Sequence, residues 1–124
     1  MEISVGKASG GRLRISSRMT PGRMIIPVAG EVDHTTAPQL RAALLPALTS
    51  GARQVELDFT QVSFCDCSGL NTLLDAYHHA RQTGVCFGVS GPLTPAVARL
   101  FALAEVESVL ATPPRSWPWP RQAR

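Results

Sequence analysis

Hydrophobic and polar positions along this chain follow two periods, one typical of strands and one typical of helices. Short apolar runs at 13–17 and 24–28 are strand-like, and the turn sequence Thr20-Pro21-Gly22 between them predicts an antiparallel pair. Apolar and acidic residues alternate over 55–59, which predicts a strand with one partly hydrated face. Residues 85–89 have the composition of a further strand.

Helical spacing predicts three helices between these strands. Thr36-Ala37-Pro38-Gln39 has capping-box spacing with proline in the first turn, so a helix is expected to begin there. Pro46 then predicts a kink or an early end, because proline inside a helix costs about 3 kcal/mol. A second helix is predicted from Ser68 to about Arg81 with Gly84 as its stop, and a third begins at Thr94-Pro95.

With a possible last strand at 107–110, the predicted order is β-β-α-β-α-β-α-β. Strands separated by a helix usually pair in parallel through right-handed crossovers. The pattern therefore predicts an α/β fold of two layers with a mixed sheet.

A length of 124 residues leaves room for one domain and some tail. We expect an N-terminal tail at 1–10, the domain at 11–112 and a C-terminal tail at 113–124. Four prolines surround Trp117 and Trp119 in the last segment, a composition that opposes both helix and central strand. Two interpretations stay open: the tryptophans rest on the domain, or they form a docking peptide for a partner.

The net charge of +3 divides unevenly along the chain, since 21–112 carries five arginines against eight carboxylates and the two ends carry seven basic residues against one glutamate. A basic excess confined to the ends argues against nucleic-acid binding. The chain has no apolar run long enough to cross a bilayer and no apolar core of a secretory signal, so a cytoplasmic protein without membrane insertion is expected. Cys65, Cys67 and Cys86 are an odd number without finger-like spacing, which predicts free thiols.

The strongest candidate site lies at 62–70, where a predicted strand leads into the N-terminus of the second helix. Free backbone N–H groups and the helix dipole favour anionic groups there, so a modification or ligand site is predicted. The simpler interpretation is that Asp66 only caps the helix and that Cys67 and Ser68 are polar residues of its first turn.

Residues 66–70, Asp-Cys-Ser-Gly-Leu, resemble the Asp-Ser-Ser/Thr-Gly-Leu hallmark of STAS domains, the anti-sigma-factor antagonist family. Upstream, Gly30-Glu31-Val32-Asp33 is similar to that family's Gly-Glu-hydrophobic-Asp segment, and the resemblance extends from about Arg23 to Leu110. It implies four or five strands with helices mainly on one face. It also implies partner switching, in which the antagonist binds an anti-sigma factor that is a serine kinase, and phosphorylation by that kinase ends the interaction.

The resemblance implies a partner-binding protein without a cofactor. The oligomeric state stays open. The implied partner-binding residues are Glu31, Asp33, His34, Thr35, Thr36, Cys65, Asp66, Cys67, Ser68, Gly69 and Leu70.

The chain departs from the family at the usual phosphate acceptor, the first residue after the aspartate, which is Cys67 here. Ser68 matches the second hydroxyl position. Three alternatives stay open: Ser68 accepts phosphate, Cys67 is a redox-sensitive substitute, or the domain is a permanently active binder. A phosphate about 5 Å from Asp33 or Asp66 would be repelled by several kcal/mol at an effective dielectric of about 20.

Enzyme and metal functions fit this sequence poorly. Cysteine phosphatases hold the phosphate with an arginine at the position where this chain has Leu73, and a receiver domain needs a lysine other than Lys7. His78 and His79 are neighbours on a helix and point about 100° apart, so they do not share a metal ion. We therefore expect a non-enzymatic protein. The alternative to an anti-sigma-factor antagonist is a STAS module of a membrane transport complex or a small-ligand-sensing domain.

Overall fold

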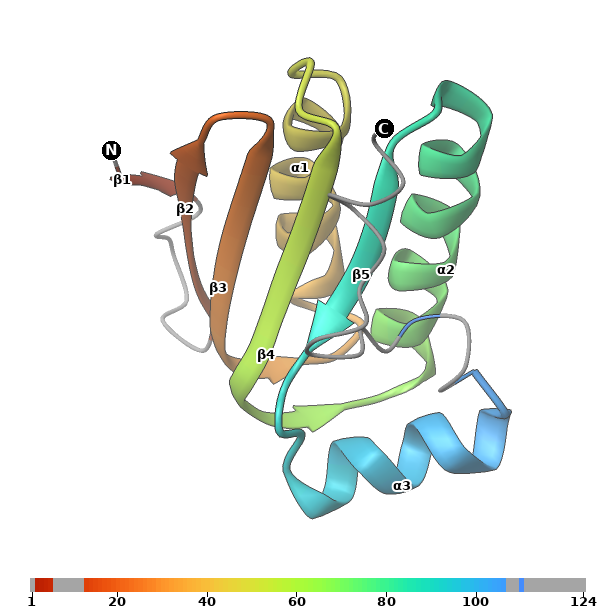
Figure 1. The fold of residues 1–124 in the computed structure, drawn as a ribbon. Helices are drawn as coiled ribbons and strands as arrows, with labels where there is room; N and C mark the ends of the chain where they lie inside the picture. The colour runs from red at the N-terminus through yellow and green to blue at the C-terminus, as the bar shows by residue number, and fades with distance from the viewer. Residues whose placement is uncertain (1, 6–12, 107–109, 111–124) are drawn as a thin grey trace.

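The computed structural model of the chain describes residues 2–5, 13–106 and 110, which form a five-stranded sheet and three helices (Figure 1). The strands follow one another across the sheet in chain order. The elements are β1 (Glu2–Val5), β2 (Leu13–Thr20), β3 (Arg23–Val32), α1 (Ala37–Leu48), β4 (Gln54–Cys65), α2 (Cys67–Thr83), β5 (Cys86–Ser90) and α3 (Pro95–Ala104).

The sheet is mixed, as the sequence pattern predicts. Strands β1, β2 and β3 pair antiparallel, whereas β3, β4 and β5 pair in parallel. Gly22, with φ of +74°, forms the turn between β2 and β3, a conformation that glycine adopts without strain. β1 lies within 1–10, the stretch predicted to be a tail, and it adds an edge strand to the sheet.

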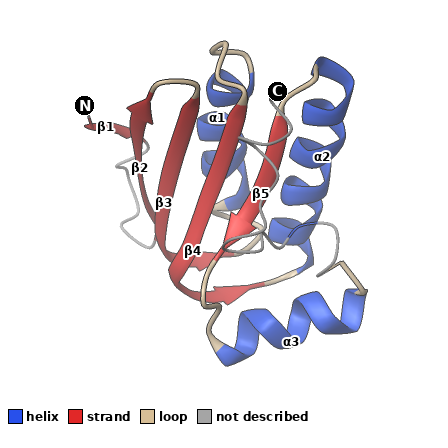
Figure 2. Cartoon of the chain, viewed as in Figure 1, coloured by secondary structure: helices blue, strands red, loops and turns tan. Residues whose placement is uncertain are grey.

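Helices α1 and α2 cover one face of the sheet, and α3 crosses the end where β4 leads into α2 (Figures 1 and 2). The core lies between the sheet and these helices. Its largest fully buried side chains include Phe59, Phe101, Leu13, Ile26, Leu40, Leu44, Leu57, Leu73 and Leu110. Two layers with the helices mainly on one side are therefore confirmed.

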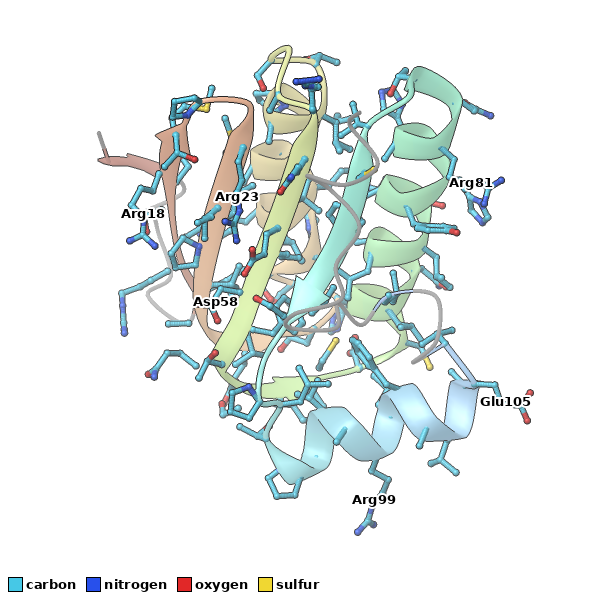
Figure 3. The ribbon with its side chains drawn as sticks, viewed as in Figure 1. Arg18, Arg23, Asp58, Arg81, Arg99 and Glu105 are labelled. Atoms are coloured by element: carbon cyan, nitrogen blue, oxygen red, sulfur yellow. The ribbon has the colours of Figure 1, made fainter. Side chains whose placement is uncertain are left out.

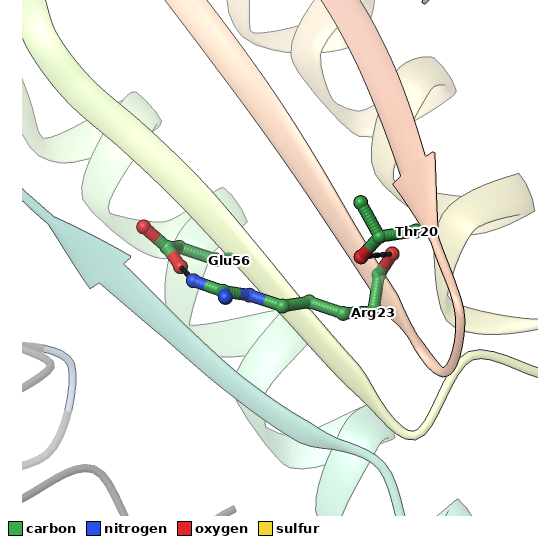
Figure 4. A network of polar contacts seen from close by, with 3 residues as sticks. All are labelled: Thr20, Arg23 and Glu56. Atoms are coloured by element: carbon green, nitrogen blue, oxygen red, sulfur yellow. Dashed lines mark hydrogen bonds and ion pairs between the residues drawn. The ribbon is translucent and has the colours of Figure 1, made fainter. Parts of the chain in front are cut away.

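The opposite face of the sheet carries polar side chains, among them those of Arg18, Arg23 and Asp58 in Figure 3. Arg23 forms an ion pair with Glu56 from β3 to β4, and its carbonyl oxygen accepts a 3.2 Å hydrogen bond from the Thr20 hydroxyl (Figure 4). Glu56 and Asp58 are both partly exposed. The predicted hydrated face of this strand is confirmed.

Helix α1 begins at the predicted residues, but the predicted side-chain cap does not form there. The helix also continues past Pro46. The Thr36 side chain makes no capping hydrogen bond to the helix and instead donates to the carbonyl oxygen of Glu31 at 2.8 Å. The early end predicted at Pro46 is wrong, because α1 continues to Leu48. Pro46 is exposed in the last turn, where water can solvate the carbonyl oxygen that its ring leaves unbonded, and Thr49 closes the helix by donating to the carbonyl oxygens of Leu45 and Pro46.

The predicted last strand at 107–110 is wrong at its final residue, because Leu110 is helical and its N–H donates to the carbonyl oxygen of Val106 at 2.9 Å. Residues 107–109 and the proline- and tryptophan-rich stretch 113–124 lie outside the described residues. None of the helices within the described ranges has the length and apolar character needed to cross a bilayer.

Candidate functional site

The two segments that carry the sequence motifs meet at the carboxyl ends of neighbouring parallel strands. Val32, the last residue of β3, is in register with Cys65, the last residue of β4. The N–H of Asp66 then donates to the carbonyl oxygen of Val32 at 3.1 Å. The sheet thus places the loop after Val32 beside the N-terminus of α2, so the two segments that carry the implied partner-binding residues are neighbours.

The first loop is organised around the Asp33 carboxylate. Its Oδ1 accepts hydrogen bonds from Thr35 N–H at 2.9 Å, from the Thr35 hydroxyl at 2.7 Å and from Thr36 N–H at 3.1 Å. The N–H of Asp33 donates to the Thr36 hydroxyl oxygen at 2.9 Å. These local bonds are the ones that short polar side chains offer to turns, and they fix the loop before α1.

The second loop is held by Asp66, which is the N-cap of α2. Its Oδ1 accepts from the N–H groups of Ser68 at 2.9 Å and Gly69 at 3.2 Å, and its backbone is extended as N-caps require. Asp66 therefore caps α2, as its position in the sequence predicts. The same carboxylate is only partly buried, so its charge also contributes to the surface.

Beneath this cap, α2 approaches β3 so closely that only glycine fits at position 69. A Cβ added to Gly69 would lie 2.5 Å from Val32 Cγ1 and 2.8 Å from Cys65 Sγ. Burial, with smaller contributions from the neighbouring Asp66 and Cys67, raises the pKa of the Cys65 thiol to about 12. Cys65 is therefore a protonated packing residue at neutral pH.

Exposure divides the predicted partner-binding residues into two groups. Seven reach the surface: Glu31, His34, Thr35 and Cys67 are exposed, and Asp33, Asp66 and Ser68 are partly exposed. The other four, Thr36, Cys65, Gly69 and Leu70, are buried. Burial assigns these four to holding the surface in place instead of contacting a partner directly.

A groove between α1 and α2, which the sequence motifs do not indicate, opens beside this surface. Its wider part, with a volume of about 530 Å³, is lined by His34, Ala37, Pro38, Arg41, Ala42, Leu45, Ser68, Asn71 and Thr72. A narrower part of about 180 Å³ is lined by Arg41, Leu44, Leu45, Leu48, Thr72, Asp75, Ala76 and His79. One available signal is Leu45, an apolar residue outside the apolar stripe of its helix, and it is 48% exposed.

Across the described ranges, no three His, Cys, Asp or Glu side chains gather into a set that could hold a metal ion. What the geometry does provide is a fixed, acidic, mostly exposed surface at the end of a mixed sheet, which is suited to binding another macromolecule. This fold and the two motifs define a STAS-type module. The chain belongs to the STAS domain family, because the family model described as "Mlab, STAS domain" matches residues 15–111.

Known proteins of this type are similar to the chain in sequence and in fold. It is 35% identical over 82 residues to an anti-sigma-B factor antagonist of Listeria monocytogenes, and the match covers 64% of this chain and 66% of that protein. The match thus spans just under two thirds of the relative's length.

Among solved structures, an anti-sigma factor antagonist from Mycobacterium paratuberculosis superposes with a TM-score of 0.75 at 23% identity, covering 86% of this chain and 90% of the other. The antagonist SpoIIAA in its unphosphorylated form gives 0.69 at 23% identity, covering 87% and 96%. The phosphorylated form of the Bacillus protein gives 0.62 at 21% identity, covering 89% and 99%. These likenesses show the same fold.

Proposed function

We propose that this protein is an anti-sigma-factor antagonist, which regulates transcription by binding an anti-sigma factor and not by catalysing a reaction. The observation that carries the proposal is the placement of the Asp33 loop and the Asp66 cap side by side at the ends of β3 and β4. Both segments are the ones that match the family's motifs, and the Listeria relative is named as such an antagonist. A partner of this kind would place the action in the cytoplasm.

The surface is built for binding because it is already ordered before a partner arrives. Asp33 and Asp66 each use one carboxylate oxygen to accept backbone N–H groups of their own loops. A surface fixed in this way loses little conformational entropy on association, which favours affinity. Asp33→Ala should therefore weaken binding much more than it lowers stability.

For the switch, we propose that the native chain is a poor substrate of the partner kinase, since a thiol occupies the usual acceptor position. Cys67 is exposed, whereas Ser68 is partly exposed and lines the groove beside α1. A hydroxyl at position 67 would be accessible to a kinase, and a phosphate there would be repelled by the Asp66 carboxylate of the same turn. The native protein then acts as a permanently active binder.

Two measurements test the function and the switch separately. Calorimetry with the anti-sigma factor captured by the native chain should show tight binding that Asp33→Ala weakens, with Arg81→Ala at the other end of α2 as the control. Intact-protein mass spectrometry after incubation with the kinase and ATP should show phosphate on Cys67→Ser but not on the native chain. Stoichiometric phosphate on the native chain, abolished by Ser68→Ala, would move the switch to Ser68.

The alternative function, a STAS module of a membrane transport complex, makes a different prediction for affinity capture. The family model that matches this chain carries the description "Mlab, STAS domain". The same affinity-capture experiment tests this alternative. A kinase-type anti-sigma factor recovered with the native chain and lost with Asp33→Ala supports the antagonist. A membrane complex recovered in its place would support the alternative.

A further inference from the structure

The two hollows between α1 and α2 form one continuous groove, because Arg41, Leu45 and Thr72 line both of them. The groove starts beside Ser68 and His34, at the proposed partner surface, and it ends beside Leu48 and His79. Since α1 and α2 cover the same face of the sheet (Figure 1), the groove extends the partner surface along the helix layer.

The two ends of the groove differ in chemistry. In the part nearest Ser68, the lining residues that the structure describes include the bases His34 and Arg41 and no carboxylate. The far part is lined by three leucines of α1 and also by Arg41, Asp75 and His79; Leu45, shared by both parts, is 48% exposed. Arg41 and Leu45 are four residues apart, so they lie on the same side of α1 about 5–6 Å apart along its axis.

We propose that this groove is a second part of the partner interface and that it takes a segment of the anti-sigma factor bearing a carboxylate followed by an apolar side chain. The carboxylate would pair with Arg41 at the basic end, and the apolar side chain would cover Leu45 and enter the leucine-lined part. This inference rests on the proposed function, and it names the chemistry of the partner that the groove selects.

Arg41 is able to accept such a partner although it already contacts Asp75. The Arg41–Asp75 pair, at 3.2 Å, joins α1 to α2 with side chains that are 49% and 61% exposed. Exposed ion pairs contribute little to stability, and a guanidinium has five N–H donors, so a second carboxylate can bind without displacing the first. Leu45 offers apolar area that a partner would remove from water.

The test uses calorimetry with the anti-sigma factor that the native chain captures. Leu45→Ala removes an exposed side chain and should leave stability unchanged while weakening binding about tenfold, as interface anchors do. The double variant Arg41→Asp with Asp75→Arg keeps an ion pair between the helices but places an anion instead of a cation in the part of the groove nearest Ser68, and it should weaken binding at least as much. Arg81→Asp, which lies on the side of α2 away from α1 in Figure 3, and Leu103→Ala on α3 are the matched controls.

A photo-crosslinker identifies the occupant directly. With p-benzoylphenylalanine at position 45, the crosslinked peptide of the anti-sigma factor should contain an Asp or Glu within one helical turn of an apolar residue, and the same label at position 103 should give no crosslink. Binding changes below twofold for both groove variants, or a crosslinked peptide without a carboxylate, would overturn the inference. If Asp33→Ala weakens binding and the groove variants do not, only this inference fails; if the native chain binds no anti-sigma factor, the proposed function fails with it.

Discussion

The N–H of Asp66 donates a 3.1 Å hydrogen bond to the carbonyl oxygen of Val32, and this bond joins the end of β4 to the end of β3. Both functional loops leave the sheet at these two residues. Their separation is therefore set by backbone pairing and not by the side chains of the loops. Substitutions on the surface should change binding chemistry while the frame beneath them stays in place.

Asp66 caps α2, and we expect its charge also to contribute to partner binding; one pair of variants separates these two roles. Asp66→Ala removes the acceptor for two N–H groups of α2 and should lower the free energy of unfolding by about 1 kcal/mol. Asp66→Asn keeps an oxygen acceptor and removes the charge, so it should retain stability and still weaken partner binding. Urea unfolding and calorimetry on both variants check this, and equal binding by Asp66→Asn and the native chain would exclude a role for the charge.

Gly69→Ala should destabilise the protein although alanine favours helices. The added Cβ would lie 2.5 Å from Val32 Cγ1, and overpacking of this kind costs about 1–3 kcal/mol. Asn71→Ala, at an exposed position of the same helix, is the control and should be close to neutral. Adding Val32→Ala should make the Gly69→Ala effect smaller, because it opens the space; purely additive effects in a double-mutant cycle would contradict the clash.

The buried Cys65 thiol predicts a loss of stability at high pH. Its pKa in the folded protein is raised from 9.0 to about 12, so the unfolded chain releases this proton at lower pH than the folded chain does. The contribution of Cys65 is complete below pH 9 and falls by about 1.4 kcal/mol per pH unit above it, until the folded pKa is reached. Urea unfolding between pH 8 and pH 11 should show this fall as the difference between the native chain and Cys65→Ala, since other groups titrate in both.

Two neighbouring leucines of α2 should differ sharply in the cost of truncation. Leu73 is fully buried, and Leu73→Ala should cost about 2–5 kcal/mol through the cavity it leaves. Leu74 is only partly buried, so Leu74→Ala should cost less than Leu73→Ala. Thermal unfolding of both variants checks the order, and neither should change partner affinity when measured well below the midpoint.

The fold was largely predictable because each element carries its own period and its own boundary residues. Gly84 ends α2 in the left-handed conformation that glycine favours, and Asp66 begins it. The errors have local causes. Pro46 is tolerated because it stands exposed in the last turn of α1, and β1 is short and joins the sheet only through pairing with β2, which a sequence pattern does not reveal.

The candidate site was predictable only in part. Its loops could be found because Asp33 and Asp66 lie in recognisable motifs. The groove could not, because it arises where α1 and α2 pack together, and residues such as Arg41 and Thr72 are separated by 31 positions in the sequence. The exposure of individual side chains could not be predicted from the sequence either. Cys65 and Cys67 are two residues apart, yet Cys65 is buried and Cys67 is exposed.

The exposure of Cys67 has a consequence for how such a regulator can change over evolutionary time. The bonds that hold this turn use the backbone of residues 66, 68 and 69 and the Asp66 side chain, and the side chain at position 67 projects outward. A hydroxyl, a thiol or an inert side chain can therefore be exchanged there at little cost to folding. Under the proposed function, one substitution at position 67 would decide whether a lineage has a regulator that is reversible, redox-responsive or always on.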